Sequence, residues 1–279
     1  MRTIEAKKIS EVISELCIRA NTVLRKDVLR ALKVALKKEK NRRARKILEA
    51  IVQNALLAAR EGLPICQDTG IATVFIQMGR EVKVAGDLNK VVDQGVRAGH
   101  TRGYLRNSVV EDPVRRGAEV DNIPSVVHLK VTGGRKLKIT VMPRGFGSEN
   151  VSRLVMLRPT DGVDKIKEAV VEAVCLAGPD ACPPFIIGVG IGGTAEKAVE
   201  LSKEALILSL DHRNPKPHIA KLEKEILDAV NGLGMGPMGL GGRTTALGIN
   251  VLTYPTHIAG LPVAIHISCH ALRSATAIL

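Results

Sequence analysis

Aromatic side chains are nearly absent from this sequence of 279 residues, which holds no Trp, two Tyr and three Phe. A sizeable core can still be buried, because 45% of the residues are apolar. That core must be built from Ile, Val, Leu and Ala. Residues 25–46, the most basic stretch, contain no aromatic side chain on which a nucleic-acid base could stack.

Long hydrophobic runs are also missing. No stretch of about twenty apolar residues could cross a bilayer as a helix, and the N-terminal M-R-T-I-E-A-K-K lacks the apolar centre of a signal peptide. We therefore expect a cytoplasmic protein with no membrane partner. The five Cys contain no C-x-x-C pair, which argues against a zinc finger or a ferredoxin-type cluster. In such a chain, metal ligation or burial is favoured over disulfides.

Acidic residues are scarce in one segment. Residues 25–46 contain eleven Lys or Arg against Asp27 and Glu39 alone, so most of the net charge of +13 lies here. Dense positive charge can bind nucleic acid. However, apolar residues recur at three- and four-residue intervals, as on one face of a helix: Val28, Leu29, Leu32 and Leu36. The pattern favours a solvated helix face, and we expect no nucleic-acid partner.

Hydrophobic periodicity predicts a mixed α/β fold in a single domain, 1–279, with a helical N-terminal part (1–62) followed by an α/β body (63–279). The first helix carries an apolar stripe at Ile9, Val12, Ile13, Leu16 and Cys17. A later helix carries Ile47, Ile51, Leu56 and Leu57 and ends at Gly62. In the body we expect strands at 71–78, 185–189, 246–253 and 261–267, and helices at 87–104, 161–176, 194–208 and 217–231.

Glycines mark the turns of the body. Segments 125–131 and 136–142 flank T-G-G-R (132–135), which predicts a β-hairpin. Glycine-rich loops are expected at 143–150 and, as an unusually flexible stretch, at 231–242.

Three cysteines lie at boundaries between predicted elements, where functional sites are often built. Cys66 lies in P-I-C-Q-D-T-G, Cys182 in G-P-D-A-C-P-P and Cys269 in H-I-S-C-H-A-L-R. Cys17 and Cys175 fall inside predicted helices instead, and Cys17 is most simply a core residue. From spacing alone, lone cysteines are more often buried apolar residues than ligands, so both interpretations stand at this point.

A second motif is Gly188-x-Gly190-x-x-Gly193, which follows a strand and opens a helix, as in a dinucleotide-binding fold. Against this, no second strand ends at Asp211, about twenty residues on. The N-terminus of the helix could equally accept another anion, such as a carboxylate.

Several motifs together resemble the α-type subunit of the class I, iron–sulfur fumarate hydratases and their L-tartrate dehydratase relatives. The resemblance runs from about residue 45 to the end in the expected order. Its segments are P-I-C-Q-D-T-G (64–70), G-Y-L-R-N-S (103–108), G-S-E-N-V-S-R (147–153), A-C-P-P-F-I-I-G-V-G-I-G-G-T (181–194), G-L-G-G-R-T-T-A-L (239–247) and L-P-V-A-I-H-I-S-C-H-A-L-R (261–273).

The resemblance implies that Cys66, Cys182 and Cys269 bind a [4Fe–4S] cluster and leave one iron without a protein ligand. Such an iron acts as a Lewis acid on a substrate, whereas a fourth cysteine would leave only electron transfer.

The resemblance also implies substrate-binding roles for Gln67, Arg106 and Gly147. Arg106 would pair with a substrate carboxylate, for which its planar two-pronged donor is better suited than Lys. Gly147 would offer a backbone N–H.

Asp68 and His257 are implied as catalytic residues, for proton handling or for orienting the base. Without the resemblance, His257 would be interpreted as a loop histidine near Pro255. His266 and His270 flank Cys269, and the sequence does not decide between a supporting role and the core.

Single-chain members of the family continue into a C-terminal domain that supplies further arginines, a lysine and a threonine base. This chain ends at Leu279, six residues after the last matching motif, so the resemblance implies an α subunit completed by a β subunit in an α2β2-type assembly. The implied reaction on a small dicarboxylate is fumarate plus water to S-malate. L-tartrate dehydratase and mesaconate hydratase are alternatives, and a dinucleotide-binding oxidoreductase is a distant one.

Overall fold

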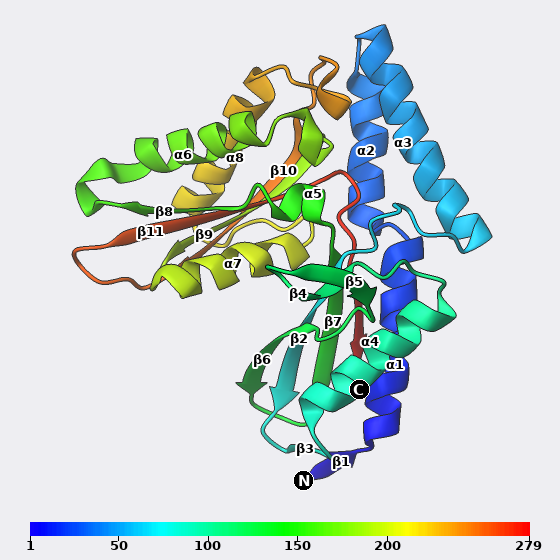
Figure 1. The fold of residues 1–279 in the computed structure, drawn as a ribbon. Helices are drawn as coiled ribbons and strands as arrows, with labels where there is room; N and C mark the ends of the chain where they lie inside the picture. Colours follow the sequence, from blue (N-terminus) through cyan, green and yellow to red (C-terminus); the bar gives the residue numbers. More distant parts are fainter. The chain divides into compact units, whose positions relative to one another are not determined.

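The computed structural model describes residues 1–279, apart from the side chains of residues 118 and 119. The chain forms two compact units, each assembled from separate stretches of sequence. Unit 1 comprises Met1–Arg25, Ala55–Phe146 and Arg273–Leu279, and unit 2 comprises Lys26–Asn54 and Gly147–Leu272. Each contains helices and a mixed sheet, which confirms the predicted mixed α/β fold (Figure 1).

Unit 1 is built on a four-stranded sheet in the order β12-β7-β2-β6. The central strand is β2, a nearly continuous apolar run that confirms the strand predicted at 71–78. It pairs with β7 in the antiparallel sense and with β6 in the parallel sense, and β12 pairs with β7. The bounds are β2 Ile71–Gly79, β6 Val126–Thr132, β7 Leu137–Arg144 and β12 Ala275–Ile278.

The predicted β-hairpin at 125–142 is wrong, because β6 and β7 do not pair with each other. Strand β2 lies between them and bonds to both. The turn between β6 and β7 passes over the end of β2, where the Glu81 N–H donates to the Gly134 carbonyl and the Gly79 N–H to the Lys136 carbonyl. Gly79 leaves no room for a Cβ beside the Gly134 backbone, so a glycine is required for this close crossing.

Helices α1 (Ala6–Thr22) and α4 (Leu88–Arg102) pack side by side against the sheet of unit 1 (Figure 1). The predicted apolar stripe of α1 is buried in this core, Cys17 included. Burial raises the pKa of the Cys17 thiol to about 12, so this cysteine stays protonated and inert. The predicted helix start at Asp87 is confirmed, since its carboxylate accepts the backbone N–H groups of Asn89 and Lys90.

Two small paired elements complete unit 1. Strands β1 (Arg2–Ile4) and β3 (Val82–Val84) form a parallel pair, and β4 (Val109–Asp112) and β5 (Arg116–Val120) form an antiparallel ribbon. Neither pair was predicted from the sequence.

Unit 2 is built on a second four-stranded sheet, in the order β10-β9-β11-β8. Strand β9 runs parallel to β10 and antiparallel to β11. The strands predicted at 246–253 and 261–267 are confirmed as β10 and β11. The bounds are β8 Arg153–Leu157, β9 Phe185–Gly192, β10 Ala246–Tyr254 and β11 Leu261–Ser268.

Helices cover both faces of this sheet. Helices α6 and α8 pack on one face, where they bury apolar side chains with those of β9, and α7 packs on the other face (Figure 1). All three were predicted to within one or two residues at each end. Their bounds are α6 Gly162–Ala177, α7 Ala195–Ile207 and α8 Pro217–Gly232.

The glycines that suggested a dinucleotide motif serve a different purpose. Strand β9 does not end at Val189 as predicted but continues to Gly192, so Gly188 and Gly190 lie inside it. A Cβ on either residue would overlap the backbone of α7, at the carbonyl oxygens of Ser202 and Ala198 respectively. These glycines let α7 approach the strand closely, and the phosphate-binding turn of a dinucleotide fold is not formed by them.

The basic segment forms α2 (Lys26–Lys38) and the start of α3 (Arg42–Glu61). Helix α2 buries Val28 and Leu32, as the periodicity predicted, and turns its cations outward. Leu56 and Leu57 on α3 are half-exposed, however, because the buried face is formed by neighbouring residues: Leu48, Ile51, Val52 and Ala55. None of the described helices is long and apolar enough to span a bilayer.

The predicted glycine-rich loop at 143–150 is largely regular. Strand β7 extends to Arg144, and a short helix, α5 (Phe146–Glu149), follows. Short 3-10 turns lie at Pro159–Asp161, Pro179–Ala181 and Pro237–Gly239, which are labelled η1, η2 and η3.

Candidate functional site

In unit 1, Cys66 lies in the loop between α3 and β2. The Ile65 N–H donates to the Asn21 carbonyl (2.9 Å), which fixes the chain just before the cysteine. The Cys66 thiol is half-buried and lies 3.2 Å from the Gln67 Oε1. The first predicted ligand is thus a free thiol on an anchored loop, next to the predicted substrate residue Gln67.

Asp68 holds the same loop through all three of its oxygen atoms. Its carboxylate accepts the N–H groups of Gly70 (2.9 Å) and Phe146 (2.8 Å), and its carbonyl accepts an Arg273 guanidinium N–H (2.8 Å). Arg273 is buried and also donates to the Asn21 side chain (3.0 Å). Asp68 therefore ties the Cys66 loop to the residue that precedes Gly147 in the chain.

Arg106 follows α4 and has an exposed side chain. Its backbone carbonyl accepts two hydrogen bonds, from the Thr69 hydroxyl (2.7 Å) and from the Asn122 amide (2.8 Å). Asn122 is fully buried, and its Oδ1 accepts the Ser108 N–H (2.7 Å). Unit 1 thereby brings Arg106 next to Thr69, three residues beyond Cys66.

In unit 2, Cys182 and Cys269 lie at the same edge of the sheet. Cys182 precedes β9 and Cys269 follows β11, and these strands are antiparallel with Ser268 opposite Ile186. The His270 backbone N–H (3.3 Å) and Nδ1 (3.1 Å) both bond to the Cys182 carbonyl. A carbonyl only accepts, so Nδ1 must carry the proton. His270 thus joins the two cysteine loops, a role that the sequence left undecided.

Cys182 has a left-handed backbone with φ 56°, which is uncommon for a residue with a Cβ. The conformation is held by a hydrogen bond from its N–H to the Pro179 carbonyl (2.9 Å). The glycine-rich segment supports the same loop, since the Met238 N–H donates to the Pro183 carbonyl (2.8 Å). Strain of this kind, fixed by neighbours, is typical of functional positions.

Gly147 lies beside the Cys182 loop, because a Cβ on it would come within 3.7 Å of the Asp180 carbonyl oxygen. Two residues on, Glu149 points into unit 2, where its Oε1 is 2.6 Å from Lys203 Nζ and 3.7 Å from His266 Nε2. The other His266 nitrogen hydrogen-bonds the Ser202 hydroxyl (2.7 Å). His266 is therefore a buried structural group that helps to hold α5.

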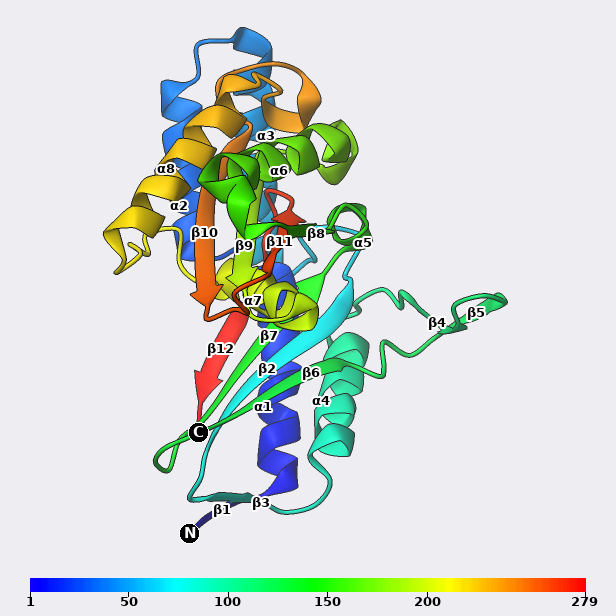
Figure 2. The same ribbon diagram turned by 90° about the vertical axis from the view of Figure 1, so that its left-hand side faces the viewer.

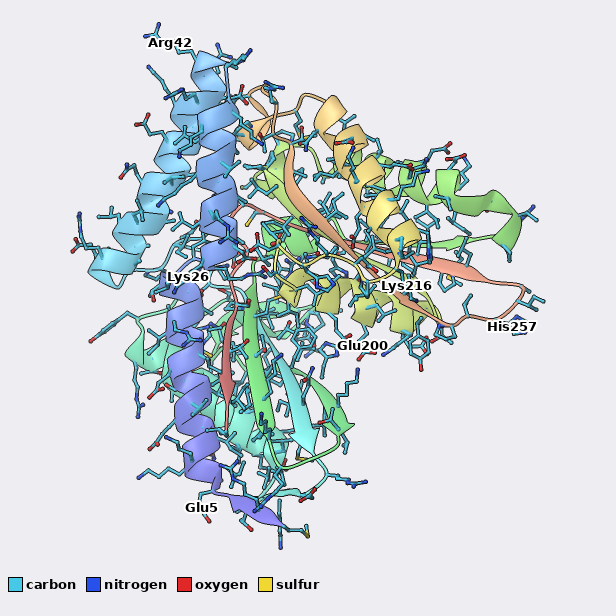
Figure 3. The ribbon with its side chains drawn as sticks, turned by 180° about the vertical axis from the view of Figure 1, so that it is seen from behind. Glu5, Lys26, Arg42, Glu200, Lys216 and His257 are labelled. Atoms are coloured by element: carbon cyan, nitrogen blue, oxygen red, sulfur yellow. The ribbon has the colours of Figure 1, made fainter. Side chains whose placement is uncertain are left out.

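His257 lies apart from the cysteines of its own unit. It occupies the exposed loop between β10 and β11 (Figure 3). A hollow of about 580 Å³ there is lined by His257, Lys197 and Tyr254, among others. Cys269 follows the other end of β11, and an eight-residue strand spans about 26 Å. Within one chain, the structure does not bring His257 together with Cys182 and Cys269.

The sequence missed the side chains that hold these loops. Asn21, Asn122 and Arg273 are buried polar residues. Arg273 bonds to Asn21 across 252 positions, and Asn122 bonds to residues 14 and 16 positions before it. The signal that could have found Arg273 is its place in the motif H-A-L-R. Among the side chains that the structure describes, no three His, Cys, Asp or Glu lie together as they would around a metal ion. Cys175 is exposed on α6, away from the loops.

Comparison with known proteins adds an independent observation. The model of the fumarate hydratase (Fumerase) family matches residues 10–278, nearly the whole chain. The chain belongs to this family. The family is one of hydro-lyases, which the sequence motifs predicted.

Individual relatives are named for L(+)-tartrate dehydratase and not for fumarate hydratase. A protein of Methanocaldococcus jannaschii, provisionally named L(+)-tartrate dehydratase subunit alpha, is 39% identical over 96% of this chain and 96% of its own length. The L(+)-tartrate dehydratase subunit alpha of Escherichia coli (strain K12) is 28% identical over 96% of this chain and 90% of its own.

Proposed function

We propose that this chain is the α subunit of a [4Fe–4S]-dependent hydro-lyase that adds water reversibly to fumarate, with its active site completed by a β subunit. The names of the similar proteins as alpha subunits support the second part of the proposal.

One observation carries the proposal. Two half-buried cysteines, Cys182 and Cys269, lie at the same end of the neighbouring strands β9 and β11, joined through His270, with Gly147 beside the Cys182 loop. Thiolates at loop positions are the ligands that iron–sulfur clusters use. Cys66 supplies the third thiol of the proposed set, whereas Cys17 is excluded by its protonated, buried state.

The proposed cluster supplies Lewis acidity, through an iron without a protein ligand, toward an oxygen of the substrate. The chain's own residues bind and orient the dicarboxylate. Arg106 pairs with one carboxylate in a two-pronged geometry, and the Gly147 N–H and the Gln67 amide donate to its oxygens. Such preorganised donors stabilise the negative charge that develops beside the carboxylate when a proton is removed.

Asp68 and His257 enter the proposal differently. Asp68 acts by positioning, because both of its carboxylate oxygens already accept backbone N–H groups. His257 could contribute to proton handling only where an assembly brings its loop to a cluster, because it lies at the opposite end of β11 from Cys269.

The ligand assignment is tested by Cys→Ser substitution. Each of Cys66, Cys182 and Cys269, changed to Ser, should remove iron and the visible absorbance of the cluster from the anaerobically purified α/β complex. Cys17→Ser and Cys175→Ser are matched controls that should keep about four iron per α chain. Loss of iron in a control, or retention in one of the first three, would show that the ligand set is wrong.

L-tartrate is the second candidate substrate, because the named relatives are tartrate dehydratases. Mesaconate remains a third within the same chemistry. Steady-state rates of the reconstituted complex on fumarate, L-tartrate and mesaconate decide between them. Fumarate should have the highest kcat/KM, and a higher value for L-tartrate would replace the proposed substrate while leaving the reaction class unchanged.

A further inference from the structure

Two of the most exposed large apolar side chains of unit 1 lie close to Arg106 in the sequence. Tyr104 is 93% exposed, and Val114, at the tip of the β4–β5 ribbon, is 89% exposed. Tyr104 lies two residues before Arg106 and Val114 eight residues after it. Between them, the Arg106 carbonyl and the Ser108 N–H both bond to the buried Asn122 side chain.

Tyr104 is presented outward at a conformational cost. Its φ of 48° lies in the left-handed region, which aromatic residues rarely adopt. The backbone is held there because the Leu105 N–H returns to the His100 carbonyl (2.9 Å) at the end of α4. Because the side chain is so exposed, its contacts within its own chain offset little of the free-energy cost of the left-handed backbone. Tyr is among the residues that contribute most when buried in an interface.

The β4–β5 ribbon extends away from the sheet and helices of unit 1 (Figure 2). Residues 111–117 are all exposed, and a two-stranded ribbon without a core is marginally stable in water. Its tip is nonetheless shaped by a defined turn, since the Asp112 carboxylate accepts the N–H groups of Val114 (2.8 Å) and Arg115 (2.6 Å). The turn holds Val114 at the end of the ribbon.

The base of the ribbon is fixed to the rest of unit 1. Asn122 bonds to Ser108, which precedes β4, and to the Arg106 carbonyl. On the returning side, Asp121 pairs with Arg97 of α4 at 2.7 Å. The buried Asn122 side chain therefore links the segment that follows β5 to the Arg106 backbone.

We infer that Tyr104 and the β4–β5 ribbon form the surface on which the β subunit docks. The inference rests on the proposed function. In that function Arg106 binds substrate in a site that a second chain completes, yet Arg106 is exposed here. The exposed Tyr104, two residues before Arg106, and the ribbon fixed to the Arg106 carbonyl are placed to meet the chain that completes the site, because water must be excluded from a site of this kind. Docking would also fix Arg106 through Asn122.

The test measures the affinity of the purified α and β subunits. Tyr104→Ser and Val114→Ser should each raise the Kd of the α–β complex about tenfold or more, as expected for buried interface anchors. Val131→Ser is the matched control, because this residue is 62% exposed on β6 of the same unit. It should change Kd less than about twofold. Tyr104→Phe keeps the ring and should retain affinity.

Circular dichroism and the iron content of each variant establish that the α subunit is still folded and loaded. Unchanged α–β affinity in both Ser variants would overturn the inference, even if iron and turnover are present as the proposed function requires. A change confined to the self-association of α, measured by sedimentation, would also overturn it, in favour of a second copy. The two proposals can also fail separately. If the wild-type α–β complex holds no iron and hydrates no dicarboxylate, the proposed function is refuted. Weakened α–β binding by the Ser variants would still support the docking surface in that case.

Discussion

Asp68 uses both oxygens of its carboxylate to hold the backbone of the Cys66 loop. A carboxylate can accept at both oxygens, and here both accept backbone N–H groups, from the β2 side of its own loop and from Phe146. An amide has only one acceptor oxygen. The geometry therefore explains why an acid is required at this position before any chemistry is considered.

We expect Asp68→Asn to lower the free energy of unfolding of the α subunit by about 1–3 kcal/mol, since an amide N–H would face a backbone N–H. Chemical denaturation of the isolated chain measures this without substrate. Asp228→Asn, in an exposed pair with Lys224 on α8, is the control and should cost little. A residue that only handles protons would leave the unfolding curve of Asp68→Asn unchanged.

At the scale of single elements, the contact between β9 and α7 depends on two glycines that have no Cβ to keep the helix away. Gly188 and Gly190 allow the helix backbone to lie directly against the strand. A methyl group at Gly190 would have to displace the helix at Ala198, because the obstacle is backbone and cannot rotate away.

Gly190→Ala should therefore destabilise the chain by about 1–3 kcal/mol, the usual cost of overpacking. Gly133→Ala is the matched control, since it has open space around it and an ordinary φ. It should be neutral or slightly stabilising. The two unfolding midpoints can be compared in one denaturant series, and equal midpoints would contradict the close packing.

Helices and central strands could be predicted from the sequence because periodicity reports burial, as in α1, β2 and α6. The pairing of strands could not. The T-G-G-R turn has the local chemistry of a hairpin, yet β2 takes the place between its two arms through contacts that only the folded chain defines. The candidate ligands were found through ordered motifs, whereas Asn21 and Asn122 escaped notice because a buried asparagine looks like a surface one in sequence.

At the scale of the whole molecule, stability depends on pH through buried histidine. His100 lies in the core of unit 1, and its Nδ1 hydrogen-bonds the Val96 carbonyl (3.0 Å). Burial lowers the pKa of His100 below its usual value of 6.5. Below pH 6.5 this histidine therefore binds a proton in the unfolded chain more readily than in the folded chain. The free energy of unfolding consequently falls as the pH falls.

The loss should reach at most about 1.4 kcal/mol per pH unit from this group. Comparing unfolding free energies at pH 7.5 and pH 5 tests it, because His100→Gln should show a smaller acid-induced loss than the wild-type chain. His212→Gln, at an exposed histidine of unit 2, should behave like the wild type. Identical pH profiles for all three proteins would exclude His100 as the cause.

Strand β12 gives the chain an order of events during its synthesis. Its residues belong to the sheet of unit 1, and the backbone of Leu279 bonds in both directions with Leu137. They are translated only after every residue of unit 2. On the ribosome, the cysteine loops of unit 2 can form while the sheet of unit 1 still lacks an edge strand. Unit 1, which is the first to be synthesised in part, is therefore the last to complete its sheet.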